Sequence, residues 1–411
     1  MRILFIAPRF PFPLDTGAKI RTYNLIKQLA KNFKVDLACF SFGCTDKGYV
    51  SEFLKIGVEV HLITLSDPKI LEKINNLLLN ALPYSISKYL SREMEDLLRL
   101  LNKRNKYDLV HFDHLHTAFY RGCFNGQICV MDEHNVEFKI LERCASVEKN
   151  IPKRILFSLQ AKKMRVFESQ KLRKFSFCLS VSGNDGDELT KASNNQTKIH
   201  VIPNGVDTDF FQPSFSDRSK MMNNQNYSQG ENSLVFTGSL DWLPNDDAVV
   251  YFCKDILPLI WQQKADVRFY IVGKSPSARL RRLCQNENRI ILTGRVDDVR
   301  SYVARAKIFV VPLRIGGGTR LKILEAMAMG KAVVSTRLGA EGIEYEENTQ
   351  IVLADTPKTF AEQVLSLLND PQKTECLGRE AREFVCQKYD WNTIGEKLNT
   401  IYEKATHDAE K

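Results

Sequence analysis

The sequence predicts an α/β protein made of two Rossmann-like halves, each a mostly parallel sheet covered by helices on both faces. Short apolar runs of strand length alternate with longer stretches of helical pattern along most of the chain. The runs are almost continuously apolar, which is typical of parallel strands buried on both faces. A polar stretch over residues 214–232, nearly free of aliphatic side chains, divides the chain as an exposed linker or loop, and each half has about 200 residues, an ordinary domain size.

The first half alternates strand-like and helical segments. In a parallel sheet, ligands bind beyond the carboxyl ends of the strands, so the residues that follow each run are the first candidates for a site. The strand-like runs span residues 2–7, 35–40, 58–65, 109–112, 128–134, 178–182 and 199–205, and helical patterns span 19–32 and 90–103.

The segment after the first strand, residues 8–21, reads PRFPFPLDTGAKIR. Its prolines exclude regular structure up to Leu14, and Asp15, Thr16 and Gly17 then introduce a helix. Gly17 is therefore a candidate for close backbone approach to an anion at a helix N-terminus. A plain helix start is an equally good interpretation, because this is a lone glycine and not a G-x-G-x-x-G motif.

The second half repeats the pattern with glycine or proline turns after its strands. Four of these glycines, Gly238, Gly273, Gly294 and Gly316, follow successive apolar runs, which places them at one carboxyl edge of one sheet. A final helical pattern covers residues 380–405. The strand-like runs span residues 233–240, 267–274, 289–295, 307–313, 331–336 and 350–354.

The most informative stretch is residues 309–330, FVVPLRIGGGTRLKILEAMAMG. A buried strand leads into Gly316, Gly317 and Gly318, and Thr319, a good N-cap residue, then opens a helix. Arg320 and Lys322 put two cations in the first turn, where the helix dipole disfavours them unless an anion lies between them. The stretch therefore predicts a phosphate or diphosphate site, with a glycine-rich turn before an ordinary helix as the alternative.

The charge is uneven along the chain, whose formal net charge is +9. Residues 1–204 hold 31 Lys and Arg against 21 Asp and Glu, whereas residues 205–411 hold 27 against 28. A basic first half suggests an anionic partner, and an anionic membrane surface is a better candidate than nucleic acid because no nucleic-acid-binding motif is present.

The ten cysteines form no C-x-x-C pair and no cluster of zinc type. Reduced thiols favour a cytoplasmic protein. The apolar N-terminal run is too short for a signal peptide, and no run approaches the ~20 apolar residues that span a bilayer. We therefore expect a cytoplasmic protein, free or attached to the inner face of the membrane.

A basic segment over residues 152–174 carries eight Lys and Arg interleaved with apolar residues. A basic amphipathic helix can lie on an anionic leaflet. A solvated helix that packs on the sheet through the same apolar residues is an equal alternative.

Two D-x-D patterns, Asp185 with Asp187 and Asp207 with Asp209, resemble the metal-binding motif of metal-dependent glycosyltransferases. Both lie away from the glycine edge, and Asp favours local backbone bonding at turns. We interpret them as caps and turns, and we expect no metal.

Several of these motifs together resemble the retaining GT-B glycosyltransferases, and most closely the bacterial group 1 (family 4) sugar transferases of surface polysaccharide pathways. The resemblance rests on residues 1–21, IPNGVD (202–207), the glycine turns and residues 316–336. It implies an N-terminal acceptor-binding domain over 1–205 facing, across a cleft, a nucleotide-sugar-binding domain over 206–385. It also implies a final helix, 386–411, that crosses back to the first domain.

The resemblance assigns donor-binding roles in the second domain. Glu325 matches the last Glu of the family's E-x7-E motif, which holds the ribose, but the first Glu would fall at Gly317. The Arg and Lys that usually follow the glycine at Gly238 and neutralise the diphosphate are also absent, so Arg320 and Lys322 are our replacements for them. The segment after Gly294, at Arg295 and Val296, matches one that meets the base.

In the first domain, YDLVHFDHLH (107–116) resembles a segment that carries an active-site His. The strict match falls on Asp113, with His114 beside it, and we favour His114 over Asp113. A histidine that merely satisfies a strand end is the structural alternative. Asp132 to Asn135 form a second polar cluster after a strand, in which Glu133 or His134 could orient acceptor hydroxyls or transfer protons.

The function implied is a metal-independent, retaining transfer of a sugar from a nucleoside diphosphate sugar to a hydroxyl acceptor, such as a sugar or a lipid-linked sugar. No cofactor is expected beyond the nucleotide sugar itself. Two alternatives remain open: a sugar-nucleotide epimerase of the same architecture, and a non-catalytic partner subunit, which the missing Glu at position 317 favours.

Overall fold

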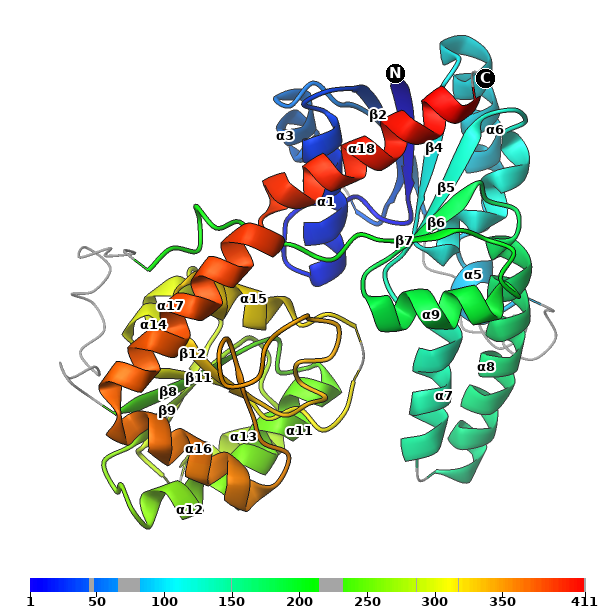
Figure 1. Ribbon diagram of the computed structural model, residues 1–411. Helices are drawn as coiled ribbons and strands as arrows, with labels where there is room; N and C mark the ends of the chain where they lie inside the picture. Colours follow the sequence, from blue (N-terminus) through cyan, green and yellow to red (C-terminus); the bar gives the residue numbers. More distant parts are fainter. Residues whose placement is uncertain are drawn as a thin grey trace. The chain divides into compact units, whose positions relative to one another are not determined.

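The computed structural model describes residues 1–43, 48–65, 82–148, 150–213, 232–285, 287–316 and 318–409. The chain divides into two compact units: unit 1 is Met1–Asn204 with Trp391–Lys411, and unit 2 is Gly205–Asp390. Each unit has its own sheet (Figure 1). The polar stretch expected over 214–232 lies outside the described residues, except for its last residue, Asn232.

Unit 1 contains a seven-stranded sheet in the order β3-β2-β1-β4-β5-β6-β7. All neighbouring strands are parallel, and Ile3 of β1 lies opposite Val35 of β2 and Leu109 of β4. The strands are β1 (Arg2–Ala7), β2 (Lys34–Ser41), β3 (Glu59–Thr64), β4 (Leu109–Asp113), β5 (Ile128–Glu133), β6 (Phe177–Ser180) and β7 (Ile199–Val201).

Two hydrophobic clusters cover the two faces of this sheet. Against one face pack α1 (Gly17–Leu29), α3 (Val50–Leu54) and α18 (Trp391–Ala409). Against the other pack α5 (Tyr84–Ser87), α6 (Arg92–Asn105), the 3-10 helix η1 (Leu115–Cys123), α8 (Ile151–Leu172) and α9 (Gly183–Ala192). The helix α7 (Glu137–Val147) pairs with α8 in a long helical hairpin (Figure 1).

The last helix, α18, belongs to unit 1 although it follows unit 2 in the chain. Its residues Trp391, Ile394 and Leu398 are buried in the cluster that also holds α1. The approach is close, because a Cβ on Gly395 would lie 2.6 Å from the Cβ of Gln28. Burial of this apolar stripe therefore fixes the helix on α1.

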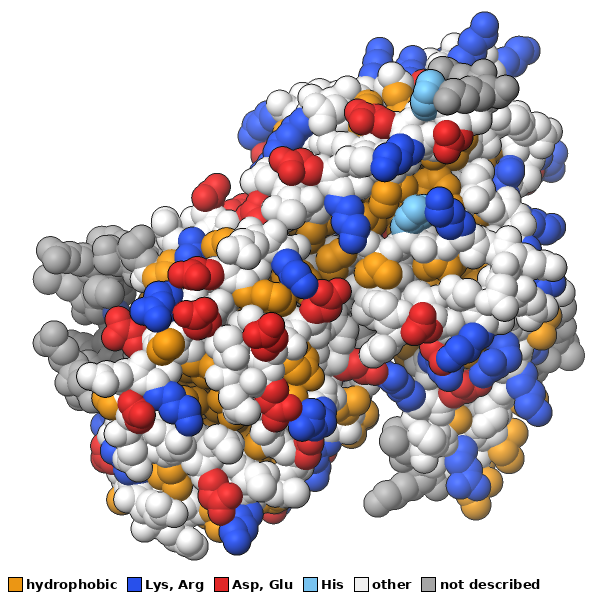
Figure 2. Space-filling view, in the orientation of Figure 1, with side chains coloured by type: hydrophobic (Ala, Val, Ile, Leu, Met, Phe, Trp, Pro, Cys, Tyr) orange, Lys and Arg blue, Asp and Glu red, His pale blue; other side chains and the backbone are white. Residues whose placement is uncertain are grey.

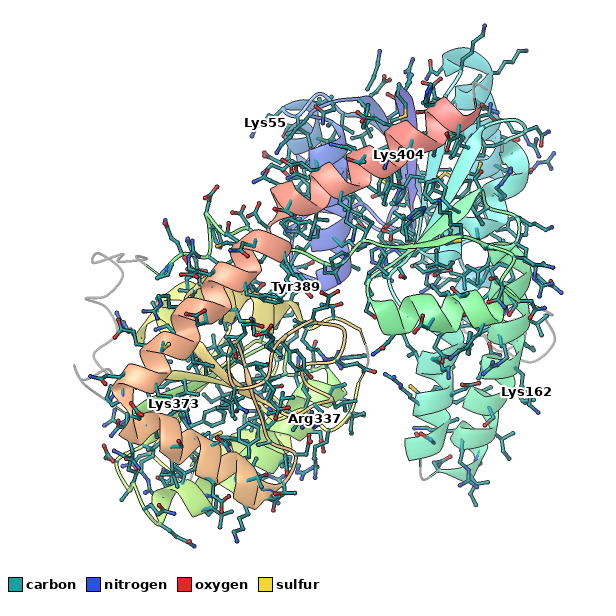
Figure 3. The ribbon with its side chains drawn as sticks, viewed as in Figure 1. Lys55, Lys162, Arg337, Lys373, Tyr389 and Lys404 are labelled. Atoms are coloured by element: carbon teal, nitrogen blue, oxygen red, sulfur yellow. The ribbon has the colours of Figure 1, made fainter. Side chains whose placement is uncertain are left out.

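The helical pattern expected over 380–405 is divided between two helices, α17 (Pro371–Lys388) and α18, separated at Tyr389 and Asp390. The final helix expected from residue 386 therefore begins later, at Trp391. Tyr389, labelled in Figure 3, lies at the end of α17. Its carbonyl accepts a hydrogen bond from the N–H of Val206 at 2.8 Å, and Asp390 accepts one from the hydroxyl of Thr208. The first contact uses a backbone carbonyl that a continuous helix would need for its own hydrogen bonds.

Unit 2 contains a six-stranded sheet in the order β10-β9-β8-β11-β12-β13, again with parallel neighbours. One hydrophobic cluster includes residues from the sheet and from its covering helices. The strands are β8 (Ser233–Thr237), β9 (Arg268–Val272), β10 (Ile290–Gly294), β11 (Ile308–Val311), β12 (Ala332–Ser335) and β13 (Val352–Leu353). The remaining helices are α11 (Leu243–Tyr251), the π-helical turn η2 (Phe252–Ile256), α12 (Leu257–Trp261), α13 (Ala278–Gln285), α14 (Arg300–Arg305), α15 (Leu321–Ala328) and α16 (Pro357–Asn369).

The prediction of an α/β protein with two parallel sheets is confirmed. In each sheet the strand order reverses beside the unit's first strand, between β1 and β4 in unit 1 and between β8 and β11 in unit 2. Ligands of open parallel sheets bind at such switch points, outside the carboxyl ends of the strands. The residues that follow these strands therefore form one candidate site in each unit.

Candidate active site

In unit 1, a buried polar cluster follows the ends of β4 and β5. Asp113 is at its centre, with only 1% of the residue exposed. One carboxylate oxygen accepts hydrogen bonds from the hydroxyl of Thr22 and from Nδ1 of His114, both at 2.9 Å, and the other meets Nε2 of His134 at 2.8 Å. The rings of His114 and His134 overlap with 3.5 Å between centroids. One carboxylate thus orients two imidazoles.

Arg21 of α1 anchors the same cluster from the helix side. Its Nε and Nη2 donate to the two oxygens of Asp132 at 3.0 and 2.7 Å, and both residues are fully buried. Its Nη1 donates to the carbonyl of Pro203 and to Oδ1 of Asn204, each at 3.1 Å. This two-point geometry ties α1 to β5 and to the segment after β7.

The charges of the cluster follow from burial and from these contacts. Burial alone would raise the pKa of Asp113, but His114 and His134 outweigh it and hold that pKa well below the ordinary value. Burial alone would lower the pKa of His134, but Asp113 and Asp132 raise it to about 8. Burial and the charge of His134 lower the pKa of His114. At neutral pH, His134 is therefore the cation and His114 the neutral imidazole.

His114 has a strained backbone, with φ 63° and ψ 148°. Such a conformation is rare for a residue with a side chain and needs support from its surroundings. Here the N–H of His114 donates to the carbonyl of Asp132 at 2.9 Å, which holds the turn. Its side chain is 14% exposed, against 1% for Asp113. With Nδ1 bound to Asp113, Nε2 is the atom of His114 that can meet a ligand.

The structure does not bring Glu133 to this cluster. Successive side chains of a strand point to opposite faces, so Asp132 points toward Arg21 while Glu133 points toward α8. Burial is the largest cause, and the charge of Glu168 the second, that raises the pKa of Glu133 well above the ordinary value. Glu168 itself accepts the backbone N–H groups of Glu137 and Phe138 at the start of α7, both at 3.1 Å.

A second buried contact joins α18 to the cluster. The hydroxyl of Tyr402 lies 2.5 Å from Nδ1 of His111, whose ring stacks on Phe5 with 3.8 Å between centroids. Burial lowers the pKa of His111 to about 4, so this histidine is neutral. Nε2 of His111 lies 3.8 Å from Asp132, which links the last helix to the Arg21 pair.

Two groups of side chains in the described parts of the chain are close enough together to hold a metal ion: Asp113 with His114 and His134, and His111 with Asp113 and Asp132. Both carboxylates, however, already have cationic or N–H partners in Arg21, His114 and His134. The buried guanidinium supplies the positive charge that a metal ion would otherwise bring.

In unit 2, Gly238 follows β8 at the switch point, and two polar side chains fill the space beside it. A Cβ at this position would lie 2.7 Å from Nζ of Lys322 and 2.8 Å from Nδ2 of Asn245, and φ is 154°. Lys322 donates to Oδ1 of Asn245 at 2.9 Å, while Nδ2 of Asn245 donates to the carbonyl of Ser239 at 2.8 Å. Asn245 therefore holds the ammonium of α15 against the loop that follows β8.

The glycine turn after β11 also lies at this switch point. Gly316 and Gly318 have φ values of 128° and 76°, a region that favours glycine. The guanidinium of Arg320 folds back over Gly316, since a Cβ there would lie 2.7 Å from Nη2. Gly317 lies outside the described residues.

The expectation that Thr319 caps the helix is wrong. Arg320 is the N-cap residue of α15, with no side-chain capping bond, and the hydroxyl of Thr319 is buried without a hydrogen-bond partner in the described structure. Thr319 packs instead against Gly342, where a Cβ would lie 3.1 Å from its hydroxyl oxygen. The helix therefore begins at Leu321, one residue later than a cap at Thr319 would place it.

Lys322 and Glu325 are both partly buried and titrate near neutrality. Burial, and then the charge of Arg320, lower the pKa of Lys322 to about 7, while Glu325 raises it. Burial raises the pKa of Glu325 to about 7, while Lys322 lowers it. A bound anion would therefore change the protonation of Lys322 and Glu325 near neutral pH.

The remaining predicted donor residues lie at the expected strand ends or helix starts. Gly294 ends β10 with φ 71°, and Val296 packs partly against the core of unit 2. Gly17 is the first residue of α1, whose N-cap is Thr16, and it is exposed.

The D-x-D patterns form turns and caps. The hydroxyl of Ser182 caps α9 by accepting from the N–H of Asp185, and Oδ1 of Asp207 accepts the N–H of Phe210 at 2.8 Å. The carboxylate of Asp185 accepts the hydroxyl of Ser182 at 2.6 Å, so the first Asp of each pattern takes part in a local cap or turn.

The basic segment 152–174 is the body of α8, and it has apolar residues on two sides. Met164 and Phe167 are buried against the sheet, as a packed helix requires. A second set is exposed, by 48% to 59%, at the spacing that aligns residues on one helix face: Ile151, Ile155, Leu159 and Val166. Figure 2 shows hydrophobic and basic side chains together on this hairpin. Within the described ranges, no helix is both long and apolar enough to cross a membrane.

Comparisons with known proteins agree with this architecture. The family described as "Glycosyltransferase Family 4" matches residues 15–210, and the family described as "Glycosyl transferases group 1" matches residues 231–370. The first match covers unit 1 from residue 15 and ends just inside unit 2, and the second falls in unit 2, so the two together cover most of the chain.

Individual relatives are distant. A GDP-mannose-dependent alpha-(1-6)-phosphatidylinositol monomannoside mannosyltransferase of Mycobacterium tuberculosis is 27% identical over 233 residues, 53% of this chain. The chain spans 59% of that protein's length. An uncharacterised glycosyltransferase of Methanocaldococcus jannaschii is 25% identical over 98% of both chains.

Solved structures share the fold. A sucrose-phosphate synthase of Thermosynechococcus elongatus superposes with a TM-score of 0.73 at 16% identity, over 99% of this chain and 100% of that one. The Anabaena protein HepE in complex with UDP gives a TM-score of 0.70 at 16% identity, over 98% of this chain and 100% of that one. The chain belongs to the group 1 glycosyltransferases and has their GT-B fold of two Rossmann-like domains.

Proposed function

We propose that this protein is a metal-independent, retaining glycosyltransferase that moves a sugar from a nucleoside diphosphate sugar to a hydroxyl acceptor. Its product would be a precursor of a cell-surface polysaccharide or glycolipid. The observation that carries the proposal is the ammonium of Lys322 at the switch point of unit 2, held 2.9 Å from Asn245 beside Gly238.

Lys322 supports a diphosphate site because it lies beside Gly238, after which the resemblance leads us to expect an Arg and a Lys that are absent here. The loop after β8 reads Gly238-Ser239-Leu240-Asp241-Trp242 and supplies no Arg or Lys. Lys322 reaches the same glycine from α15, and Arg320 covers the neighbouring Gly316. These two cations can bind the departing diphosphate and stabilise the charge that grows on it in the transition state.

Glu325 is the proposed anchor for the ribose hydroxyls. It lies one helical turn after Lys322, on the face of α15 that also presents the ammonium. Hydrogen bonds from two ribose hydroxyls to a carboxylate are strongest when the carboxylate is shielded from water, and Glu325 is partly buried here. The segment after Gly294, at Arg295 and Val296, is the proposed contact to the base, and Gly17 the proposed backbone contact from unit 1.

On the acceptor side, we assign the contact with the reacting sugars to His114 and a positioning role to Asp113. Asp113 is buried and already accepts three hydrogen bonds, so its oxygens are not available as a nucleophile. His114 is more exposed, neutral, and oriented through Nδ1. A neutral imidazole held in this way can accept a proton from an acceptor hydroxyl or bond to a sugar hydroxyl.

Metal independence is proposed from the cations that the chain itself provides. Arg320 and Lys322 can balance the diphosphate in unit 2, and Arg21 balances the carboxylates in unit 1. Retention is proposed from the resemblance of residues 202–207 and 316–336 to the retaining GT-B glycosyltransferases.

Attachment to an anionic leaflet is proposed for α8. Its exposed apolar set is flanked by the exposed cations Lys153, Arg154 and Lys162, the last of which is marked in Figure 3. Apolar side chains can enter the headgroup region while each Lys or Arg contributes about 1 kcal/mol at an anionic surface. The M. tuberculosis relative acts on a phosphatidylinositol mannoside, which supports a lipid-linked acceptor and a site at the inner face of the cytoplasmic membrane.

A donor screen tests the proposal. Thermal shift with UDP-, GDP-, ADP- and dTDP-sugars should select one base, and the selected donor should release its nucleoside diphosphate faster when acceptor is added. Product NMR should show the donor's anomeric configuration, and EDTA should leave the rate unchanged. Consumption of the nucleotide sugar without acceptor, to give an isomeric nucleotide sugar, would identify an epimerase. Absence of both donor binding and turnover would identify a partner subunit.

A further inference from the structure

A cavity of about 320 Å³ lies at the amino ends of β11 and β12 in unit 2. Gly238 and Gly316 follow the carboxyl ends of β8 and β11, so the cavity is at the edge of the sheet opposite to the proposed donor site. Its walls come from the ends of α14, α15 and α16 and from the first turn of α17. Its volume is at the lower end of the range, roughly 300–1,000 Å³, that small-molecule sites span.

The lining of this cavity combines apolar and cationic side chains. Leu367 and Leu368, from the last turn of α16, are buried. Among the described residues that line the cavity, Glu375 is the one acid, and it is exposed. The cations of the lining outnumber it: Arg305, Lys307 and Lys331. A small molecule that carries a negative group on a short carbon body matches this lining.

The ammonium of Lys331 is held in place at the end of α14. Its Nζ donates to the carbonyls of Ala304 and Ala306, at 2.5 and 3.0 Å. An ammonium group has three N–H donors, so these two bonds leave one donor for a ligand. Burial lowers the pKa of Lys331 to about 8, so the group is still charged at neutral pH, and a neighbouring anion would raise that pKa again.

The walls of the cavity are closely packed. The helices α15 and α17 meet backbone to backbone, because a Cβ on Gly378 would overlap the carbonyl oxygen of Gly330. The hydroxyl of Thr374 donates to the carbonyls of Leu367 and Asp370, at 2.6 and 3.0 Å, which joins the end of α16 to the start of α17. The cavity is therefore formed before any ligand binds, as is usual for small-molecule sites.

One helix, α15, extends from the proposed donor site to the cavity. Arg320 and Lys322 lie at its start, whereas Gly330 and Lys331 follow its end. Its helical residues span about 12 Å. Buried side chains fix it in the core of unit 2: Ile323, Leu324, Ala326, Met327 and Ala328. A ligand that shifts one end of this packed helix therefore shifts the ammonium at the other end.

We propose that this cavity is an effector site for a small organic phosphate, which binds Lys331 and Arg305 and changes the affinity for the nucleotide sugar through α15. The phosphate lies on the two cations, and the carbon body lies against Leu367 and Leu368. The inference rests on the proposed function, since it names a regulator of that donor site. Coupling of this kind is reciprocal, so the donor changes the affinity for the effector by the same factor.

Calorimetric titration of the full chain with phenyl phosphate tests the site. Phenol is the neutral control, and inorganic phosphate is the control without a carbon body. We expect phenyl phosphate to bind about tenfold more tightly than phenol, because only the phosphate accepts charge-assisted hydrogen bonds. Inorganic phosphate should also bind more weakly, since it makes no apolar contact. If either control binds as tightly as phenyl phosphate, the site is wrong.

Variants locate the binding. Arg305→Gln should weaken phenyl phosphate about fivefold, and Glu375→Gln should tighten it about threefold by removing a nearby negative charge. The matched controls are Lys404→Gln on α18, marked in Figure 3, and Glu383→Gln, an exposed acid farther along α17. Lys322→Gln should bind phenyl phosphate normally, which separates the cavity from the proposed donor site. Loss of binding in Lys322→Gln, or equal effects in the variants and their controls, would overturn the proposal.

Donor titrations with and without saturating phenyl phosphate measure the coupling. The donor affinity of the unmodified chain should change about fivefold or more, and that of the double variant Arg305→Gln, Lys331→Gln should not. An unchanged donor affinity with phenyl phosphate bound would overturn the effector role. If no nucleotide sugar binds the unmodified chain, the proposed function is wrong and the effector role is wrong with it. Binding of phenyl phosphate in the cavity is decided separately, by the first titration.

Discussion

Arg21 on α1 and Asp132 at the end of β5, 111 residues apart in the chain, form a two-point ion pair with no solvent exposure. Asp132 keeps its charge because Arg21 and His134 outweigh the effect of burial and lower its pKa. The pair joins a helix of one face to the end of β5, where the carbonyl of Asp132 accepts the N–H of His114, the proposed reacting residue.

Replacing Arg21 by Met should destabilise unit 1 by about 3–5 kcal/mol, because it leaves a buried carboxylate without its counter-charge. Urea unfolding followed by circular dichroism measures the change. The matched control is Arg99→Gln, which breaks the exposed Arg99–Glu95 pair on α6 and should not shift the transition. A shift of similar size in both variants would contradict the role of burial.

His114→Gln should lower kcat by about 100-fold and leave donor affinity unchanged, since the imidazole is proposed to act on the acceptor hydroxyl. Asp113→Asn should also lower kcat, and it should change the pH profile because two imidazoles lose their charged partner. The control is His200→Gln, a half-buried histidine of β7 outside the cluster. A kcat within twofold of the unmodified enzyme in His114→Gln would rule out the assignment.

Donor affinity should fall as pH rises through neutrality. The pKa of Lys322 in the free protein is about 7, so the ammonium that attracts the diphosphate is present below pH 7 and lost above it. A bound diphosphate raises that pKa, and linkage then predicts affinity about tenfold lower at pH 8 than at pH 6.

Lys322→Arg is the matched control for this pH dependence, because a guanidinium stays charged across the range. Calorimetric titrations at both pH values should show the slope in the unmodified protein and a smaller slope in the variant. Glu325 also has a pKa of about 7, and any slope that remains in Lys322→Arg reports that group. An equal slope in both proteins would show that Lys322 does not titrate on donor binding.

Binding of α8 to membranes should need both its apolar set and its charge. The double variant Ile155→Ser, Leu159→Ser should lose most of its flotation with vesicles that contain phosphatidylglycerol, and Lys153→Glu, Lys162→Glu should do the same. Vesicles of phosphatidylcholine alone should bind weakly in every case. Leu100→Ser, which changes a leucine on α6 that is 43% exposed, is the control and should float normally.

Much of the fold could be predicted because it depends on local pattern. The apolar runs at 2–7, 109–112 and 233–240 became β1, β4 and β8 with bounds shifted by no more than a few residues. Parallel topology follows from the alternation of strands and helices, and within each sheet it places the carboxyl ends of the strands at one edge. Gly238, Gly316, Lys322 and His114 were therefore predicted near the strand ends where they lie.

Other site residues carried no local signal. In the sequence, Arg21 is indistinguishable from an ordinary basic residue of a helix, and Asn245 from any polar residue near the start of a helix. Their partners, Asp132 and Lys322, are remote in sequence, so no spacing pattern could reveal either contact. The prediction that Thr319 caps α15 was wrong for a related reason. The preference of threonine for N-cap positions is a local property, whereas the position of Thr319 depends on its tertiary contact with Gly342.

The sequence by itself determined the elements, their order and the family, because backbone preference and hydrophobic period act within a few residues. Only the tertiary structure decided which polar side chains meet: that Asp132 points toward α1 while Glu133 points away from it, and that α15 supplies the cation at Gly238. Those contacts depend on strand pleat and register, which bring distant residues within hydrogen-bond distance only after the sheets have formed.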